Sequence, residues 1–155
     1  MSNDFNRAAL LTGLEEQRTQ LLALLPQFSD EQWRGVARED GWTIHDIAVH
    51  VADSTYGRAL IALGEGREAL PTDPTSGQVS PHDFNEYRRQ KNRELPREKL
   101  MSRMVAAFAA AQRALETVED LDTPVNFGEG ATKGRVLQRI VEHLAEHQGE
   151  LQASA

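Results

Sequence analysis

Apolar side chains recur every three or four positions along most of the chain, which is the period of an amphipathic α-helix. The pattern predicts long helices from residues 3–4 to 25 and over 43–63, 97–118 and 132–152, with a shorter one over 81–94. Strand signals are weak. These helices predict an all-α fold, a four-helix bundle with one long crossover connection and short extra helices, as a single domain of 155 residues.

The second long helix has the clearest start. Thr43 is a good N-cap, and Asp46 at the third helical position completes a capping box. Trp42 before the cap and Ile47 after it fit a hydrophobic staple. Gly64 follows the last apolar position and predicts the end of this helix.

Local signals also mark the other boundaries. An asparagine and an aspartate at positions 3–4 can cap the first helix, and Pro26 ends it. A capping box that starts at Ser29 predicts a short helical turn around Trp33. Residues 66–80 are rich in Pro, Gly, Thr and Ser without periodicity, which predicts the longest loop of the chain.

Composition and charge narrow the functional classes. Apolar residues make up 39% of the chain and charged residues 26%, which is typical of a globular protein. No apolar run reaches the roughly 20 residues of a membrane span, and the polar N-terminus has no signal-peptide pattern, so we expect a cytoplasmic protein without a membrane partner. The net charge of −7 argues against a nucleic-acid partner. The partner that we expect is a small-molecule substrate.

The chain contains no cysteine. This excludes thiolate metal ligands and a thiol nucleophile supplied by the protein. Any metal site must therefore use nitrogen and oxygen ligands. Any thiol chemistry must bring its thiol on a small molecule.

Two histidines of the last helix, His143 and His147, lie four residues apart, so their side chains point the same way one turn apart. On a helical wheel with Ile140 at zero, His147 falls at about −20° and His143 at about −60°, inside the apolar stripe. The spacing suits two imidazoles on one metal ion, and the alternative is a pair of core histidines that arose by chance.

A third candidate ligand, His50, lies on the edge of the apolar arc of the second long helix, roughly 10 Å from the helix start. His143 and His147 lie about 8 to 14 Å from the end of theirs, so an antiparallel pairing brings all three to one level. Three neutral nitrogen ligands with an open fourth position are typical of a catalytic site. Histidine nitrogens suit zinc, nickel, iron and copper, of which zinc and nickel are our first candidates.

The other histidines are weaker candidates. His45 points away from Ile47, and we expect it to be solvated. His82 opens the helix that follows the long loop, where a surface position is the simpler interpretation and the mouth of the site is the alternative.

Several side chains could surround the site. Asp46 and Asp53 lie one turn on either side of His50, and either could hold an imidazole, although capping is favoured for Asp46. Arg58 shares the arc of Ile47, where it could meet an anionic substrate group or pair with a glutamate of another helix.

The loop over residues 26–42 and the crossover are expected at the same end of the bundle as the histidines. They would supply candidates for the pocket wall: Trp33, Trp42, Phe84, Asn85 and Tyr87. For Trp42, ordinary packing as part of the hydrophobic staple is favoured.

The chain resembles the DinB-like (YfiT-like) superfamily in two segments. Residues 41–52, GWTIHDIAVHVA, are similar to the W-[ST]-x-x-D-[LIV]-x-x-H segment of that family, and residues 141–147, VEHLAEH, are similar to its terminal H-x-x-x-H helix. Phe84-Asn85, followed by a long amphipathic helix, is more specifically similar to the mycothiol-dependent maleylpyruvate isomerase branch. The resemblance implies a four-helix bundle with a divalent metal ion on His50, His143 and His147.

The resemblance further implies thiol-dependent isomerisation or transfer with mycothiol, bacillithiol or glutathione, or a hydrolytic reaction. Three neutral imidazoles leave the full charge of the ion in place, which lowers the pKa of bound thiol or water. Our leading hypothesis is a small-thiol-dependent S-transferase or isomerase. A metal-dependent hydrolase and a non-catalytic metal-binding bundle are the alternatives, and we expect a homodimer.

Overall fold

The computed structural model describes residues 5–65, 81–127 and 130–155. It confirms the all-α fold, in which four long helices form a bundle: α1 (Arg7–Leu24), α3 (Ile44–Leu63), α5 (Arg97–Thr117) and α6 (Lys133–Ala153). The shorter elements are the 3₁₀ turn η1 (Leu25–Gln27) and the helices α2 (Asp30–Arg34) and α4 (Pro81–Lys91). No helix in these described ranges combines the length and apolarity of a membrane span.

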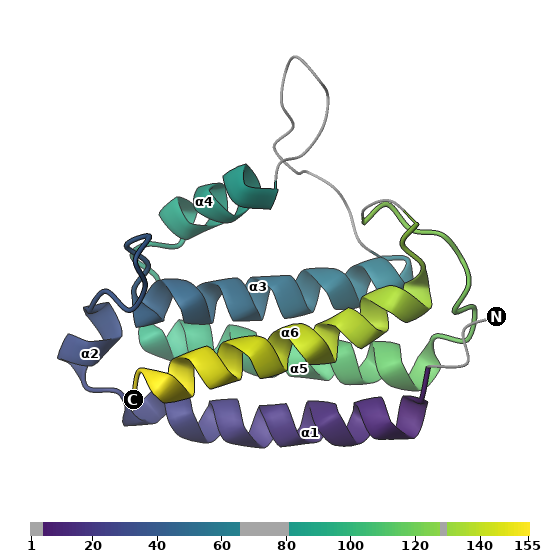
Figure 1. Ribbon diagram of the computed structural model, residues 1–155, viewed down its shortest axis with the longest axis horizontal. Helices are drawn as coiled ribbons and strands as arrows, with labels where there is room; N and C mark the ends of the chain where they lie inside the picture. The colour runs from purple at the N-terminus through teal and green to yellow at the C-terminus, as the bar shows by residue number, and fades with distance from the viewer. Residues whose placement is uncertain (1–4, 66–80, 128–129) are drawn as a thin grey trace, which may run out of the picture.

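The chain direction of the four long helices confirms the predicted crossover. Figure 1 shows α3 and α5 running the same way, with α4 in the connection between them, while α1 and α6 run the opposite way. α3 packs against both α5 and α6, and α1 packs against the same two helices. The start of α3 and the end of α6 therefore lie at one end of the bundle, beside α2 (Figure 1).

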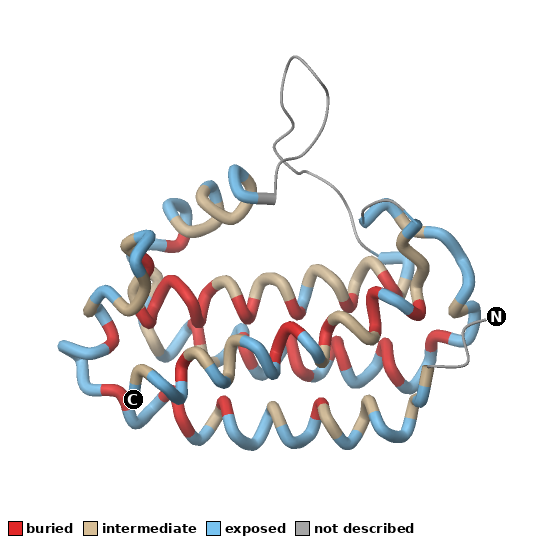
Figure 2. Tube along the Cα trace, viewed as in Figure 1, coloured by how far each residue is buried: buried red, intermediate tan, exposed pale blue. Residues whose placement is uncertain are grey.

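Buried positions are unevenly distributed over the bundle. Figure 2 shows buried and exposed positions in turn along α1 and α5, as expected of helices with one wet face. The first half of α3 is different, since eight of the nine residues over 44–52 are buried. Both α2 and α4 pack against α3 in addition to the bundle helices, so its outer face is covered.

The capping signals place the helix starts well, with one error. Thr43 and Asp46 form the predicted capping box, and Gly64 ends α3 with φ of 75°, a left-handed conformation that glycine adopts without strain. α1 begins later than predicted, because its N-cap is Asn6, whose side chain accepts a hydrogen bond from the backbone N–H of Ala9. Residues 3–4 and the predicted loop 66–80 lie outside the described residues.

α4 ends at Lys91, three residues before the predicted boundary at 94. The side-chain amide of Asn92 donates to the carbonyl of Arg88, and the backbone N–H of Leu95 bonds to the carbonyl of Asn92, so the chain turns there. Two ion pairs hold α4 on α3. They join Arg88 to Asp53 at 2.9 Å and Arg89 to Asp46 at 3.0 Å.

Candidate metal centre

His50 of α3 and His143 and His147 of α6 come together in one group, which we call the histidine cluster. The Nε2 atom of His143 lies 3.1 Å from Nε2 of His50 and 3.0 Å from Nε2 of His147. One ligand nitrogen from each ring lies within 4.8 Å of the other two. The three histidines therefore lie at the same height along the bundle axis, as the helix lengths predict.

The spacing of the nitrogens fits a metal ion. Zinc–nitrogen bonds of about 2.0–2.1 Å in tetrahedral geometry separate neighbouring nitrogens by about 3.3–3.4 Å. The observed separations of 3.0 and 3.1 Å differ from that value by a few tenths of an ångström. Imidazole nitrogens suit zinc, nickel, iron and copper, so this cluster can hold a divalent ion.

Burial keeps two of the three imidazoles neutral. It lowers the pKa of His50 to about 3, and the positive charge of His147, when protonated, and of Arg58 lowers it further. It lowers the pKa of His143 to about 2, with Arg58 as the second cause. Neutral imidazole is the form that binds a metal ion, so these two rings have the required charge state at neutral pH.

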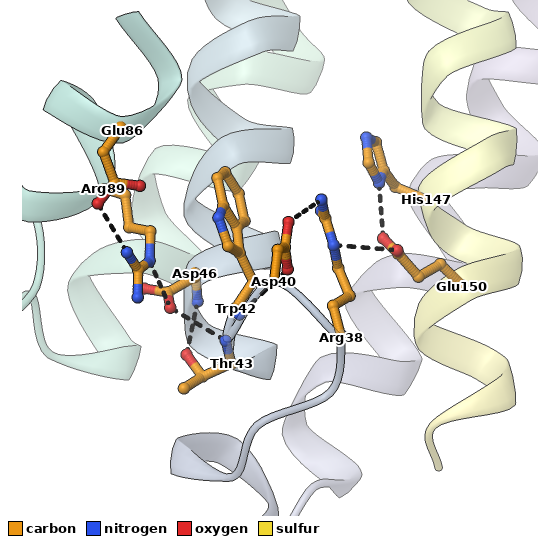
Figure 3. Close-up of polar contacts among 9 residues, drawn as sticks. All are labelled: Arg38, Asp40, Trp42, Thr43, Asp46, Glu86, Arg89, His147 and Glu150. Atoms are coloured by element: carbon orange, nitrogen blue, oxygen red, sulfur yellow. Dashed lines mark hydrogen bonds and ion pairs between the residues drawn. The ribbon is translucent and has the colours of Figure 1, made fainter. Parts of the chain in front are cut away.

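Glu150 contacts the nitrogen of His147 that faces away from the cluster. Its carboxylate Oε1 lies 2.9 Å from Nδ1 of His147, and its other oxygen lies 3.8 Å from Nε of Arg38, which in turn pairs with Asp40 (Figure 3). A carboxylate only accepts hydrogen bonds, so Nδ1 of His147 carries the proton and Nε2 presents its lone pair to the cluster. This carboxylate–histidine arrangement orients metal ligands in many proteins.

Sequence reasoning missed Glu150, although a signal for it exists. It lies three residues after His147 on the same helix, a spacing at which side chains meet.

His50 has weaker support. Its Nδ1 lies 3.2 Å from Oγ of Ser54, one turn further along α3. The Trp42 ring packs edge-on against its imidazole, with centroids 5.7 Å apart. Figure 3 shows Trp42 between Arg38 and Arg89, whose guanidinium carbons lie 4.7 and 5.9 Å from the indole centroid. Trp42 therefore lies between His50 and Arg89 of α4.

His143 has the opposite kind of partner. Its Nδ1 lies 3.1 Å from Nη1 of Arg58. A guanidinium only donates hydrogen bonds, so Nδ1 must accept and the ring proton lies on Nε2, facing the other two Nε2 atoms. Without an ion, the Nε2–H of His143 can therefore donate to Nε2 of His147, 3.0 Å away.

The two aspartates beside His50 are engaged elsewhere. Asp46 caps α3 and accepts from Nε of Arg89, and Asp53 pairs with Arg88. Burial alone would raise the pKa of Asp46, but hydrogen bonding by His45, the backbone N–H of Thr43 and Arg89 holds the pKa well below its usual range.

The prediction that His45 is solvated is wrong, since it is only 4% exposed. Its Nε2 lies 2.9 Å from the carbonyl oxygen of Leu95, and Trp33 packs edge-on against its ring. The α4–α5 connection and α2 cover this face of α3, which a wheel drawn for one helix does not reveal. His45 is a satisfied core histidine.

The remaining predicted residues lie further out. Trp33 is buried between His45 and the guanidinium of Arg97, so its contacts are with the packing at the bundle end. Asn85 and Phe84 are half-buried on α4, Tyr87 is 49% exposed, and His82 is exposed.

One comparison with known proteins gives a match. The sequence model of the DinB superfamily matches residues 13–151, which include all three histidines and both helices that carry them. No curated protein and no solved structure gave a match. The matched region covers most of the chain, and the protein belongs to the DinB superfamily.

Proposed function

We propose that the protein is a metal-dependent enzyme in which His50, His143 and His147 hold a divalent ion, zinc or nickel. The observation that carries the proposal is the convergence of three Nε2 atoms at 3.0 and 3.1 Å, with the Glu150 carboxylate behind one of them. A divalent ion on three neutral imidazoles supplies a positive charge that lowers the pKa of a thiol or water beside it. Tetrahedral coordination by three ligands leaves a position for a small molecule.

The surroundings favour a catalytic site over a structural one. In the part of the chain that the structure describes, the ligand group consists of the three histidines, and no carboxylate joins it as a fourth member. Structural sites of this kind are closed by a fourth protein ligand. Glu150 accepts a hydrogen bond from Nδ1 of His147 and so orients that ring, while Trp42 packs edge-on against His50.

For the reaction we propose transfer or isomerisation that depends on a small thiol such as mycothiol or bacillithiol. The support is the resemblance of Phe84-Asn85 and the following helix to the maleylpyruvate isomerase branch, and because the chain contains no cysteine the thiol would come from a small molecule. Loss of an electrophilic probe such as monochlorobimane, measured with each thiol and with zinc-loaded protein, tests this. Equal rates with and without protein would refute it.

The metal site is tested by elemental analysis of the purified protein after removal of metal and reloading with zinc. We expect about one ion per chain in the wild type and in His82→Ala, the matched control with an exposed histidine. His147→Ala should retain little ion while its circular dichroism stays helical. Equally low metal in all three proteins would overturn the proposal. The expected homodimer remains a prediction that light scattering would check.

A further inference from the structure

Arg58 of α3 is a mostly buried cation that pairs with no acid among the described residues. Its Nε is buried and has no hydrogen-bond partner, and among the described residues no carboxylate lies within ion-pair distance of it. Glu146 is close enough to raise the pKa of Arg58, but its carboxylate pairs with Arg139 at 3.0 Å. Burial lowers the pKa of Arg58 to about 10, which still leaves the guanidinium charged at neutral pH.

The known contacts of Arg58 do not account for the charge. One face of the guanidinium lies 5.3 Å from the ring centroid of Phe127, a cation–π contact that suits a cation but does not neutralise it. The other contact, Nη1 to Nδ1 of His143 at 3.1 Å, joins two nitrogens. A buried cation normally has an anionic partner, and the residues that the structure describes supply none to Arg58.

The contact with His143 also conflicts with metal binding through Nε2. A neutral imidazole that offers its Nε2 lone pair to an ion carries its proton on Nδ1, which then needs an acceptor. Arg58 can only donate, so its guanidinium has to leave Nδ1 when the cluster holds an ion. Its N–H donors are then available for another acceptor, one imidazole ring away from the ligand nitrogens.

We propose that Arg58 is the anion-binding residue of this site and that the substrate carries a carboxylate which it holds beside the cluster. The inference rests on the proposed metal site and names its substrate class. A carboxylate fits because the planar guanidinium fork binds it through two parallel hydrogen bonds, and the unpartnered Nε is one of the donors available. Withdrawal of the site from water strengthens such a pair.

The test uses two hydroxamates with the same metal-binding head. Acetohydroxamic acid is neutral at its tail, and succinic acid monohydroxamate carries a carboxylate there. Calorimetric titration of zinc-loaded wild type should show about tenfold or greater preference for the carboxylated probe, the effect of a charged hydrogen bond. Arg58→Gln should bind acetohydroxamate and lose the preference, while Arg58→Lys should recover part of it.

The matched control is Arg113→Gln, since Arg113 is exposed and pairs with Glu65 away from the cluster. It should keep the preference. Metal loading is measured first, so failure to load zinc refutes the proposed metal site and with it the inference. Loaded wild type that binds both probes equally or binds neither, or loaded Arg58→Gln that keeps the preference, overturns the inference while the metal site stands.

Discussion

Two buried polar groups lie on α3 within two turns of each other, and they differ in how their donors and acceptors are matched. In the first, which we call the capping group, Thr43 and Asp46 exchange hydrogen bonds at 3.0 Å, and Asp46 also accepts from Arg89. His45 meets a backbone carbonyl. In the histidine cluster, Nε2 atoms face one another, and Arg58 donates to an imidazole.

The difference separates a structural group from a binding site. Buried polar groups in folded proteins are nearly all hydrogen-bonded, and the capping group follows that rule with partners from its own chain. Beside the histidine cluster, Nε of Arg58 has no partner among the described residues, and the cluster itself brings three ligand nitrogens together. A cation at that point and an anion beyond it would complete the cluster.

The largest effect is expected from Glu150→Gln. The amide oxygen can still accept from Nδ1 of His147, but the negative charge that favours a bound cation is gone. We expect zinc affinity to fall by about 10- to 100-fold, the usual effect of losing a carboxylate behind a ligand histidine. A zinc-chelator competition assay measures it.

Glu142→Gln is the matched control, because Glu142 lies on the same helix and pairs with Arg135 at the surface. Its zinc affinity should equal that of the wild type. Equal zinc affinities for both variants would mean that Glu150 is an ordinary surface partner of His147. The histidine cluster would then not differ from the capping group as a binding site differs from a structural group.

The next effect is on stability and falls on the capping group. Asp46→Asn should lower the free energy of unfolding by about 1–2 kcal/mol at pH 7, because the variant loses the charged acceptor of the capping box and of Arg89. The pKa of Asp46 is lowered by folding, so its contribution is complete above the unfolded value of about 3.9 and declines as pH falls below it.

Urea unfolding at a series of pH values from 7 to 3.5 checks this. The difference between the wild type and Asp46→Asn should shrink toward the acid end, whereas the exposed Asp30→Asn should stay within about 0.5 kcal/mol throughout. A difference that grows with acidity would contradict the sign of the pKa shift. Zinc affinity should not change in either variant.

The capping group and the histidine cluster also differ in how much of each could be predicted from the sequence. Thr43 and Asp46, which form the capping box, lie only three positions apart, so local sequence determines it. The level of His50 opposite His143 follows from helix lengths and direction. The partners of His45 and His143 do not, because Leu95 and Arg58 lie 50 and 85 residues away from them, and their contacts depend on packing between elements.

The smallest effect should have the opposite sign. Arg58→Met keeps a long apolar stem and removes a buried charge that no described acid pairs with, so the metal-free protein should gain up to about 1 kcal/mol of stability. Arg89→Met in the capping group should lose about 1 kcal/mol, because it leaves the Asp46 carboxylate without its ion-pair partner. Urea unfolding of both variants in chelator measures the pair. A loss in Arg58→Met as large as that in Arg89→Met would show that Arg58 is part of the packing, whereas a gain would show that the chain keeps this arginine at the expense of its own stability, as expected of a residue whose partner arrives with the substrate.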